Sequence, residues 1–154
     1  MIDSLENMIS AVEEWIESDH LFVMTEVRKL EKEILDLNRD QLWDDGRGHD
    51  GQPIASGRQY STRTVQQKMR EGKPFKHVTL HDTGDFHDDF FIGYDDVGQF
   101  ASEFFIESKD QKTPDLVTDW GSTIFGLDDT SITILTEDHL RPALIQSFRS
   151  HIIG

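Results

Sequence analysis

Hydrophobic residues in the first 45 positions recur at helical spacing. They form two series, Leu5, Met8, Ile9, Val12 and Ile16, followed by Val23, Val27, Leu30, Ile34 and Leu37. Residues spaced i, i+3, i+4 and i+7 share one face of an α-helix. No glycine or proline interrupts the two series, and their phase changes at Ser18–His20, where Ser18 or Asp19 can cap a second helix. The pattern therefore predicts one kinked helix or a helical hairpin over residues 1–45.

The middle of the chain changes pattern twice. Glycines and a proline fill residues 44–59, which predicts a long loop. Residues 60–72 (YSTRTVQQKMREG) predict a short helix, with Val65 and Met69 four apart, Gly72 at the end, and a cap at Ser61, Thr62 or Thr64.

Three runs of strand character follow, at residues 77–80, 90–94 and 99–108, with a turn at 95–98 between the last two. Three successive strands predict an antiparallel meander. The third run alternates, so one face is expected to be buried beneath the N-terminal helices. The buried face would hold Phe100, Phe104 and Ile106, and the opposite face Ala101, Glu103, Phe105 and Glu107.

The remaining residues are mostly helical in pattern. A helical turn is predicted in residues 115–127 with an end at Gly121, and a helix in 140–153. Proline fits a helix only in its first turn, so Pro142 places the start near Asp138. Residues 128–135 fit a strand or a helix. The expected fold class is α+β, with N-terminal helices packed on a small antiparallel sheet and a C-terminal helix. One domain is expected over residues 1–154, with a helical region (1–45), a loop, short helix and β-meander (46–108) and a mostly helical tail (109–154).

Charge and composition exclude several functions. The chain has 154 residues, no cysteine and a formal net charge of −15, and its apolar runs are too short to span a bilayer. This charge opposes non-specific binding to nucleic acid or anionic lipid. Only residues 28–32 and Arg58–Lys76 are candidates for a basic patch. An acidic N-terminus is atypical of a signal peptide, so synthesis in the cytosol is expected.

The stretch VTLHDTGDFHDDFF at residues 78–91 concentrates histidine and aspartate. A metal-dependent hydrolase could use nitrogen and oxygen ligands from His77, His81, Asp82, Asp85, His87, Asp88 and Asp89. No HExxH or other stringent metal spacing is present. An architectural turn is favoured instead, because Asp82 can accept backbone N–H bonds, Thr83 can cap, and Gly84 can supply a positive φ. Such a turn would direct Phe86 and Phe90 into the core.

No catalytic motif was found elsewhere in the sequence. There is no GxSxG elbow, P-loop or GxGxxG after a strand, and no cofactor is expected. The phenylalanines lack interleaved basic residues, so they are expected in the core rather than stacked on bases. A further alternative, from charge alone, is an acidic mimic of nucleic acid that inhibits a DNA-binding protein.

The order of three segments resembles a known family. NRDQLWDDG, HDGQPIASGRQYSTRTVQQKMREG and VTLHDTGDFHDDFFI, within residues 38–106, are similar to phage virion-morphogenesis and tail-completion proteins. Those proteins carry a YSxxTxxxK pattern followed by LxxTGxLxxSI. The corresponding positions are Gly51, Pro53, Tyr60, Ser61, Thr64, Lys68, Leu80, Thr83, Gly84, Phe86 and Ile92, with Asp82 inside the second pattern.

This resemblance implies a small α+β protein without catalytic residues, in a ring at the head–tail junction of a virion. The implied partners are copies of itself, the portal-bound adaptor and tail proteins, with no membrane. Genome DNA would pass nearby without specific binding. The implied location is the virion, and the host cytoplasm during assembly. A closed ring needs two different complementary patches, and the loop 44–59 and the turn 95–98 are the candidates.

Overall fold

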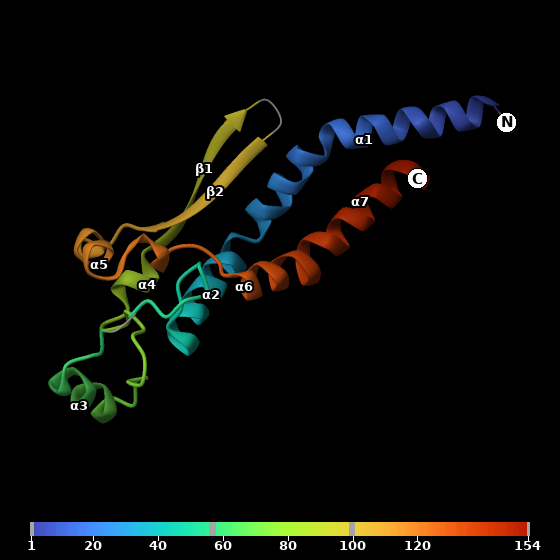
Figure 1. The fold of residues 1–154 in the computed structure, drawn as a ribbon. Coiled ribbons are helices and arrows are strands. Elements are labelled where there is room, and N and C mark those ends of the chain that lie inside the picture. Colours follow the sequence, from blue (N-terminus) through green and yellow to red (C-terminus); the bar gives the residue numbers. More distant parts are fainter. Residues whose placement is uncertain (1, 56–57, 99–100, 154) are drawn as a thin grey trace.

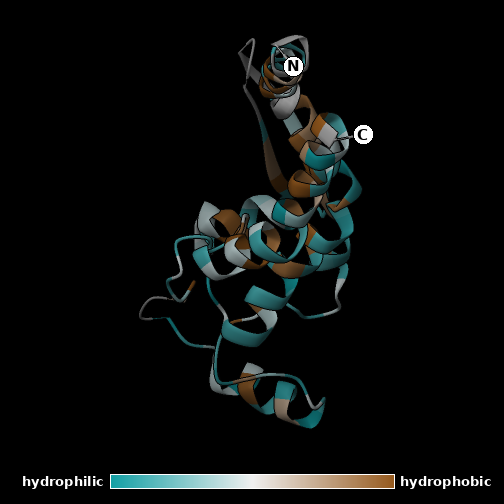
Figure 2. Cartoon of the chain, turned by 90° about the vertical axis from the view of Figure 1, so that its right-hand side faces the viewer, coloured by the Kyte–Doolittle hydropathy of each residue, from teal (hydrophilic) through white to brown (hydrophobic). Residues whose placement is uncertain are grey.

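The chain forms an elongated α+β molecule. A computed structural model describes residues 2–55, 58–98 and 101–153, with the side chains of all except 2–5, 18–20, 96–98, 101–102 and 153. At one end, α1 (Ile2–Lys29) and α7 (Arg141–Ile153) lie side by side (Figure 1). At the opposite end lies α3 (Thr62–Arg70), and Figure 2 shows the same separation after a quarter turn. Among the described residues, no helix is long and apolar enough to cross a membrane.

The N-terminal region is a bent helix rather than a hairpin. Helix α1 runs unbroken through residues 18–20, so the expected cap at Ser18 or Asp19 is wrong. The break lies at Leu30 (φ −101°, ψ 13°), before α2 (Glu31–Asp40) and a π-helical turn at Gln41–Asp45. The two hydrophobic series of residues 1–45 differ in phase because they pack against different parts of the molecule. Upstream, Trp15 packs edge-on against Phe148 of α7, whereas downstream residues enter the main core.

The sheet is a hairpin of two strands, β1 (Phe90–Gly98) and β2 (Ala101–Ser108). They pair antiparallel, with Phe90 opposite Ser108 and Tyr94 opposite Phe104. The predicted strands at 90–94 and 99–108 are thus confirmed where described, but the strand at 77–80 and the three-stranded meander are wrong. The turn expected at 95–98 is also wrong, because these residues belong to β1 and pair with β2. Residues 77–80 pair with no strand in the described part of the chain. At Thr79 two side chains take the place of a ladder, since the Tyr60 hydroxyl accepts from its N–H and His87 Nε2 donates to its carbonyl.

The two faces of β2 differ as the alternation predicts. Ile106 is buried and Phe104 half-buried, whereas Glu103, Phe105 and Glu107 are exposed. The side chains of Phe100 and Ala101 lie outside the described set. The N-terminal helices cover the hairpin, as expected. The hydroxyl of Tyr94 donates to a Glu31 carboxylate oxygen at 2.6 Å, and the Arg28 guanidinium carbon lies 3.8 Å from the centre of the Tyr94 ring.

The tail is helical, and the alternative of a strand at 128–135 is wrong. Short helices α4 (Asp85–Asp88) and α5 (Thr113–Trp120) flank the hairpin in sequence. A 3₁₀ turn at Ser122–Ile124, α6 (Asp129–Ile134) and a π-helical stretch at Leu135–Leu140 then lead into α7. Gly121 ends α5, as predicted. The helix start expected near Asp138 is wrong, because the helical backbone runs without a break from Asp129, so Pro142 lies inside that run although it is the second residue of α7.

Two buried amides dock the tail on its own chain. Asn38 receives a hydrogen bond from the Gly126 N–H at 3.1 Å and donates to the Ile124 carbonyl at 3.3 Å. Gln41 accepts from the Asp128 N–H at 2.8 Å and donates to the Gly126 carbonyl at 3.2 Å. The buried hydrophobic cluster joins residues from all parts of the sequence: Val27, Ile34, Leu42, Ile54, Val78, Phe86, Phe90, Ile106, Ile124, Leu127 and Leu135.

Candidate functional site

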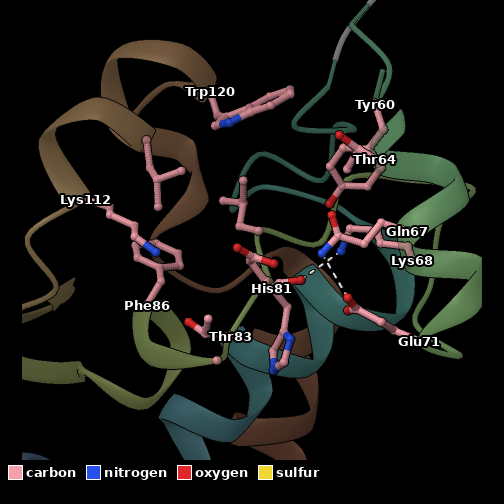
Figure 3. A pocket seen from close by; sticks show the side chains of 14 residues that line it. Tyr60, Thr64, Gln67, Lys68, Glu71, His81, Thr83, Phe86, Lys112 and Trp120 are labelled. Carbon is pink, nitrogen blue, oxygen red and sulfur yellow. Dashed lines mark hydrogen bonds between the residues drawn. The ribbon is translucent and has the colours of Figure 1, made fainter. Parts of the chain in front are cut away.

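Most residues of the family pattern surround one cavity, of about 390 Å³. It lies between α3, the segment 80–86 and α5 (Figure 3). The pattern residues in its wall are Tyr60, Thr64, Lys68, Leu80, Asp82, Thr83, Gly84 and Phe86. Lys112, Leu116 and Trp120, from the start and body of α5, complete the opposite side. Residues expected from two separate sequence patterns therefore meet in space.

Helix α3 begins after Ser61 and carries Lys68 on its buried side. The Ser61 hydroxyl oxygen accepts a hydrogen bond from the Thr64 N–H at 3.2 Å, which satisfies one of the free donors of the first turn. Ser61 is thus confirmed as the cap. Gly51 lies apart from the cavity, in the loop, with φ 71° and open space beside its Cα. The position of Gly51 requires glycine for the backbone turn in the loop, and Gly51 does not line the cavity.

Thr79 joins the walls of the cavity to the core. It is fully buried, and its N–H donates to the Tyr60 hydroxyl oxygen at 2.9 Å. Its carbonyl accepts from the His87 Nε2–H at 2.9 Å, and its hydroxyl lies 3.4 Å from both Tyr60 Oη and Lys68 Nζ. We call Tyr60, Lys68, Thr79 and His87 the Thr79 cluster. Tyr60 and His87 thus bond the two backbone polar groups of Thr79, as a neighbouring strand would.

Lys68 is a buried cation with no carboxylate partner. Its side chain is 6% exposed, and among the described residues it forms no ion pair. Its ammonium group donates to the His81 carbonyl at 2.8 Å and lies 4.8 Å from the centre of the Tyr60 ring. Removing a charge from water is costly unless it is compensated. Neutral oxygens and an aromatic face provide that compensation here.

The acid at the C-terminal end of α3, Glu71, is engaged elsewhere. A Glu71 carboxylate oxygen lies 2.7 Å from Lys73 Nζ, and its other oxygen accepts from the Gln67 amide at 2.9 Å. These hydrogen bonds, chiefly the one from Lys73, lower the pKa of Glu71. The positive charge of Lys68 therefore has no hydrogen-bonded acid beside it, and the exposed Lys112 faces the same cavity from α5.

The turn from residue 80 to 84 is conformationally unusual. Leu80 has φ 55° and is the one described residue other than glycine with a positive φ, which costs about 1–2 kcal/mol. Gly84 has φ 108°, as the sequence predicts, and a Cβ there would lie 3.3 Å from His81 Nε2. Thr83 donates to the Asp85 carboxylate at 2.6 Å. The role expected for the Asp82 carboxylate is wrong, because Asp82 instead contributes its carbonyl, which accepts from Lys73 Nζ at 2.5 Å.

The turn directs both aromatic rings inward, as predicted. Phe86 and Phe90 are each 5% exposed, and their ring centres lie 5.0 Å apart in an edge-on arrangement. Ser108 fixes the carbonyl of Phe86 with a hydrogen bond of 2.9 Å. The segment 80–90 therefore serves the core as well as the cavity wall.

The histidines proposed as metal ligands are directed at different partners. His77 Nε2 donates to the Trp43 carbonyl at 2.7 Å, and His87 Nε2 donates to Thr79. Burial lowers the pKa of His87 to about 4. His81 packs edge-on against Trp43, and its buried Nδ1 has no hydrogen-bond partner in the described part of the chain. No three His, Asp or Glu side chains there converge as metal ligands.

Sequence reasoning missed several residues of the site. Thr79 was included only in a predicted strand, and Lys112, Leu116 and Trp120 were not considered for function. No local signal links α5 to α3, since these positions are some forty residues apart in the sequence. Only packing brings them together. Comparison of the chain with protein-family models, with curated proteins and with solved structures gives no match.

Proposed function

We propose that this chain is a structural component of a tailed-phage virion and forms part of the ring at the head–tail junction. The supporting observation is the convergence of the pattern residues on one cavity, in which their polar groups hold the backbone. Tyr60 and Lys68 both act on the segment 79–81, and Gly84 supplies the turn. The positions that resemble the tail-completion pattern would thus have an architectural role in this chain.

The side-chain arrangement also favours this function over a metal-dependent hydrolase. His77 and His87 each use a ring nitrogen to hold a backbone carbonyl, on Trp43 and Thr79 respectively. A metal site needs several side chains directed at one point, and the residues at 77–89 lack this convergence. The partners in this proposal are copies of the chain, the portal-bound adaptor and tail proteins. The proposed locations are the virion and, during assembly, the host cytoplasm.

The acidity of the chain suits a protein that surrounds a DNA passage. With a net charge of −15, an acidic lining would repel the phosphate backbone and allow the genome to slide without specific binding. Because the net charge of the chain is negative, it could attract DNA only through a local patch of basic residues.

Genetics of the encoding prophage or phage tests this function. Deletion of the gene is expected to yield filled heads and separate tails, and the wild-type gene in trans should restore joined particles. An antibody against the purified chain should label the junction of those particles. Normal infectious particles formed without the gene would contradict the proposal.

A further inference from the structure

The charge of the molecule is divided between its two ends. Before Arg28 the sequence contains no lysine or arginine, and α1 contains the acids Asp3, Glu6, Glu13, Glu14, Glu17, Asp19 and Glu26. The segment Arg58–Lys76, which includes α3, is the reverse. Its basic residues are Arg58, Arg63, Lys68, Arg70, Lys73 and Lys76, against the one acid Glu71. Figures 1 and 2 place α3 and the free end of α1 at opposite ends of the molecule.

The cavity at the basic end combines positive charge with apolar walls. Among the described residues Lys68 forms no ion pair, and Lys112 enters from the other side (Figure 3). Two acids also line the cavity, Glu71, which pairs with Lys73, and Asp82. Leu80, Phe86, Leu116 and Trp120 supply apolar surface, and the Arg58 guanidinium carbon lies 5.5 Å from the centre of the Trp120 ring. The chemistry that fits these walls is a carboxylate next to aliphatic side chains.

Helix α1 presents that chemistry on its surface. Ile9, Glu13 and Ile16 are spaced i, i+4 and i+7, so they form one strip along the helix. Ile9 is 50% exposed and Ile16 is 58% exposed, and Glu13 is exposed between them. Helix α7 covers a neighbouring face through Phe148 and leaves these large aliphatic side chains in water. We call Ile9, Glu13 and Ile16 the α1 strip.

We propose that the α1 strip of one copy docks into the cavity between α3 and α5 of a second copy. The inference rests on the proposed function, and it names the two different surfaces that a ring of identical subunits needs. Opposite charge selects this pairing, because most other contacts between two copies would bring acidic surfaces together. The Glu13 carboxylate would approach Lys112 and Lys68, while Ile9 and Ile16 contact the apolar wall.

The positions of the two surfaces favour head-to-tail assembly. Since the N-terminal part of α1 and the helices α3 and α5, which line the cavity, lie at opposite ends of an elongated chain, each docked copy still presents a free strip and a free cavity. Repetition of one such contact gives a ring when the rotation closes. A two-fold dimer would instead require one surface to match itself. The head-to-tail contact therefore predicts oligomers larger than a dimer.

A charge swap tests the contact in the full-length protein. Sedimentation velocity over a concentration series should show assembly of the wild type. Lys112→Glu and Glu13→Lys should each weaken it about tenfold or more, because each places like charges together. The double variant should restore assembly to near the wild-type level. Both positions are exposed, and a carboxylate at the start of α5 suits the helix dipole, so the variants should stay folded, as circular dichroism can verify.

Lys76→Glu is the matched control, since Lys76 is exposed and belongs to the same basic segment but lies outside the cavity wall. Lys76→Glu alone should change assembly little. The double variant Lys76→Glu with Glu13→Lys should assemble as weakly as Glu13→Lys alone. Equal effects of Lys76→Glu and Lys112→Glu would overturn the docking site and leave the proposed function in place. A monomeric wild type at all concentrations would also overturn it. Binding of DNA that both lysine variants abolish would assign the basic end to nucleic acid instead.

Discussion

The Lys68 ammonium group donates a hydrogen bond to the His81 carbonyl at 2.8 Å and lies in the wall of a cavity, where it forms no ion pair with any described residue. This contact ties α3 to the segment that leads into Gly84 and α4. It connects the two halves of the family pattern, which are separated in sequence by the residues 69–79. The same side chain thus serves the fold and leaves positive charge for a partner.

Tyr60→Phe should destabilise the protein by about 1–3 kcal/mol, because it leaves the buried N–H of Thr79 without an acceptor. Urea denaturation measures this free energy of unfolding. The control is Tyr94→Phe, since Tyr94 bonds to the partly exposed Glu31, which water can solvate after the change. An equal or smaller loss for Tyr60→Phe would contradict the role assigned to the Thr79 cluster.

Gly84→Ala should cost more stability than Gly72→Ala. Gly72 has φ 67°, near the left-handed helical region, and its Cβ would meet nothing within 4 Å. Gly84 has φ 108°, outside that region, and its Cβ would crowd His81. The expected losses are about 1 kcal/mol at Gly72 and about 2–3 kcal/mol at Gly84. Thermal unfolding of both variants checks the order, and Gly84→Val should be worse than either. Reversal of the order would exclude a strained turn at residue 84.

Gln41→Met should weaken the packing of residues 124–134 against the end of α2. Gln41 contacts Arg47, Gly126, Asp128 and Ser131 through its amide, and its loss leaves several buried polar groups unpaired. A loss of about 3 kcal/mol or more is expected. The exposed Gln66→Met is the control. Amide hydrogen exchange should show faster exchange in residues 124–134 for Gln41→Met alone, and unchanged protection there would contradict the docking of the tail by Gln41.

Acid should weaken the fold through His87. Its pKa is lowered to about 4 in the folded state, against the ordinary value of 6.5, because burial disfavours the charged ring. As the pH falls, His87 is therefore protonated at a higher pH in the unfolded chain than in the folded protein. The contribution of His87 is present above pH 6.5 and is lost as the pH falls toward 4. The loss at pH 5 is on the order of 2 kcal/mol.

Urea denaturation at pH 7.5 and pH 5 measures this loss. His87→Gln, which keeps a donor for the Thr79 carbonyl, should remove the His87 part of the pH dependence, whereas the exposed His49→Gln should not. The same pH dependence in wild type and His87→Gln would show that His87 is not a buried neutral ring.

The helical periodicity, the Ser61 cap, the Gly84 turn and the β1–β2 hairpin were predictable because each depends on neighbours in the sequence. The strand at 77–80 was wrong because its short apolar run gives no sign that side chains, rather than a third strand, bond the backbone of Thr79. In α3 the spacing of Val65 and Met69 predicts the helix but not which face is buried. The structure leaves Met69 56% exposed and buries Lys68, because tertiary hydrogen bonds with residues 79–81 outweigh hydropathy.

The pairing of α3 with α5 was beyond sequence reasoning for a different reason. Lys112 and Trp120 are distant in the chain and belong to no motif, so the cavity exists only through packing. The separation of acidic and basic residues between the two ends of the molecule was only partly predictable from the sequence. The basic segment Arg58–Lys76 was evident in the sequence, but its distance from the acidic half of α1 required the fold.

The most direct test of a structural, ring-forming protein is the mass, shape and metal content of one purified sample. Light scattering gives the mass, negative-stain microscopy the shape, and elemental analysis the metal. The account predicts closed rings of the chain without stoichiometric metal. A monomer that carries one equivalent of zinc, iron or manganese would contradict it and would favour hydrolase chemistry at the histidines and aspartates of residues 77–89.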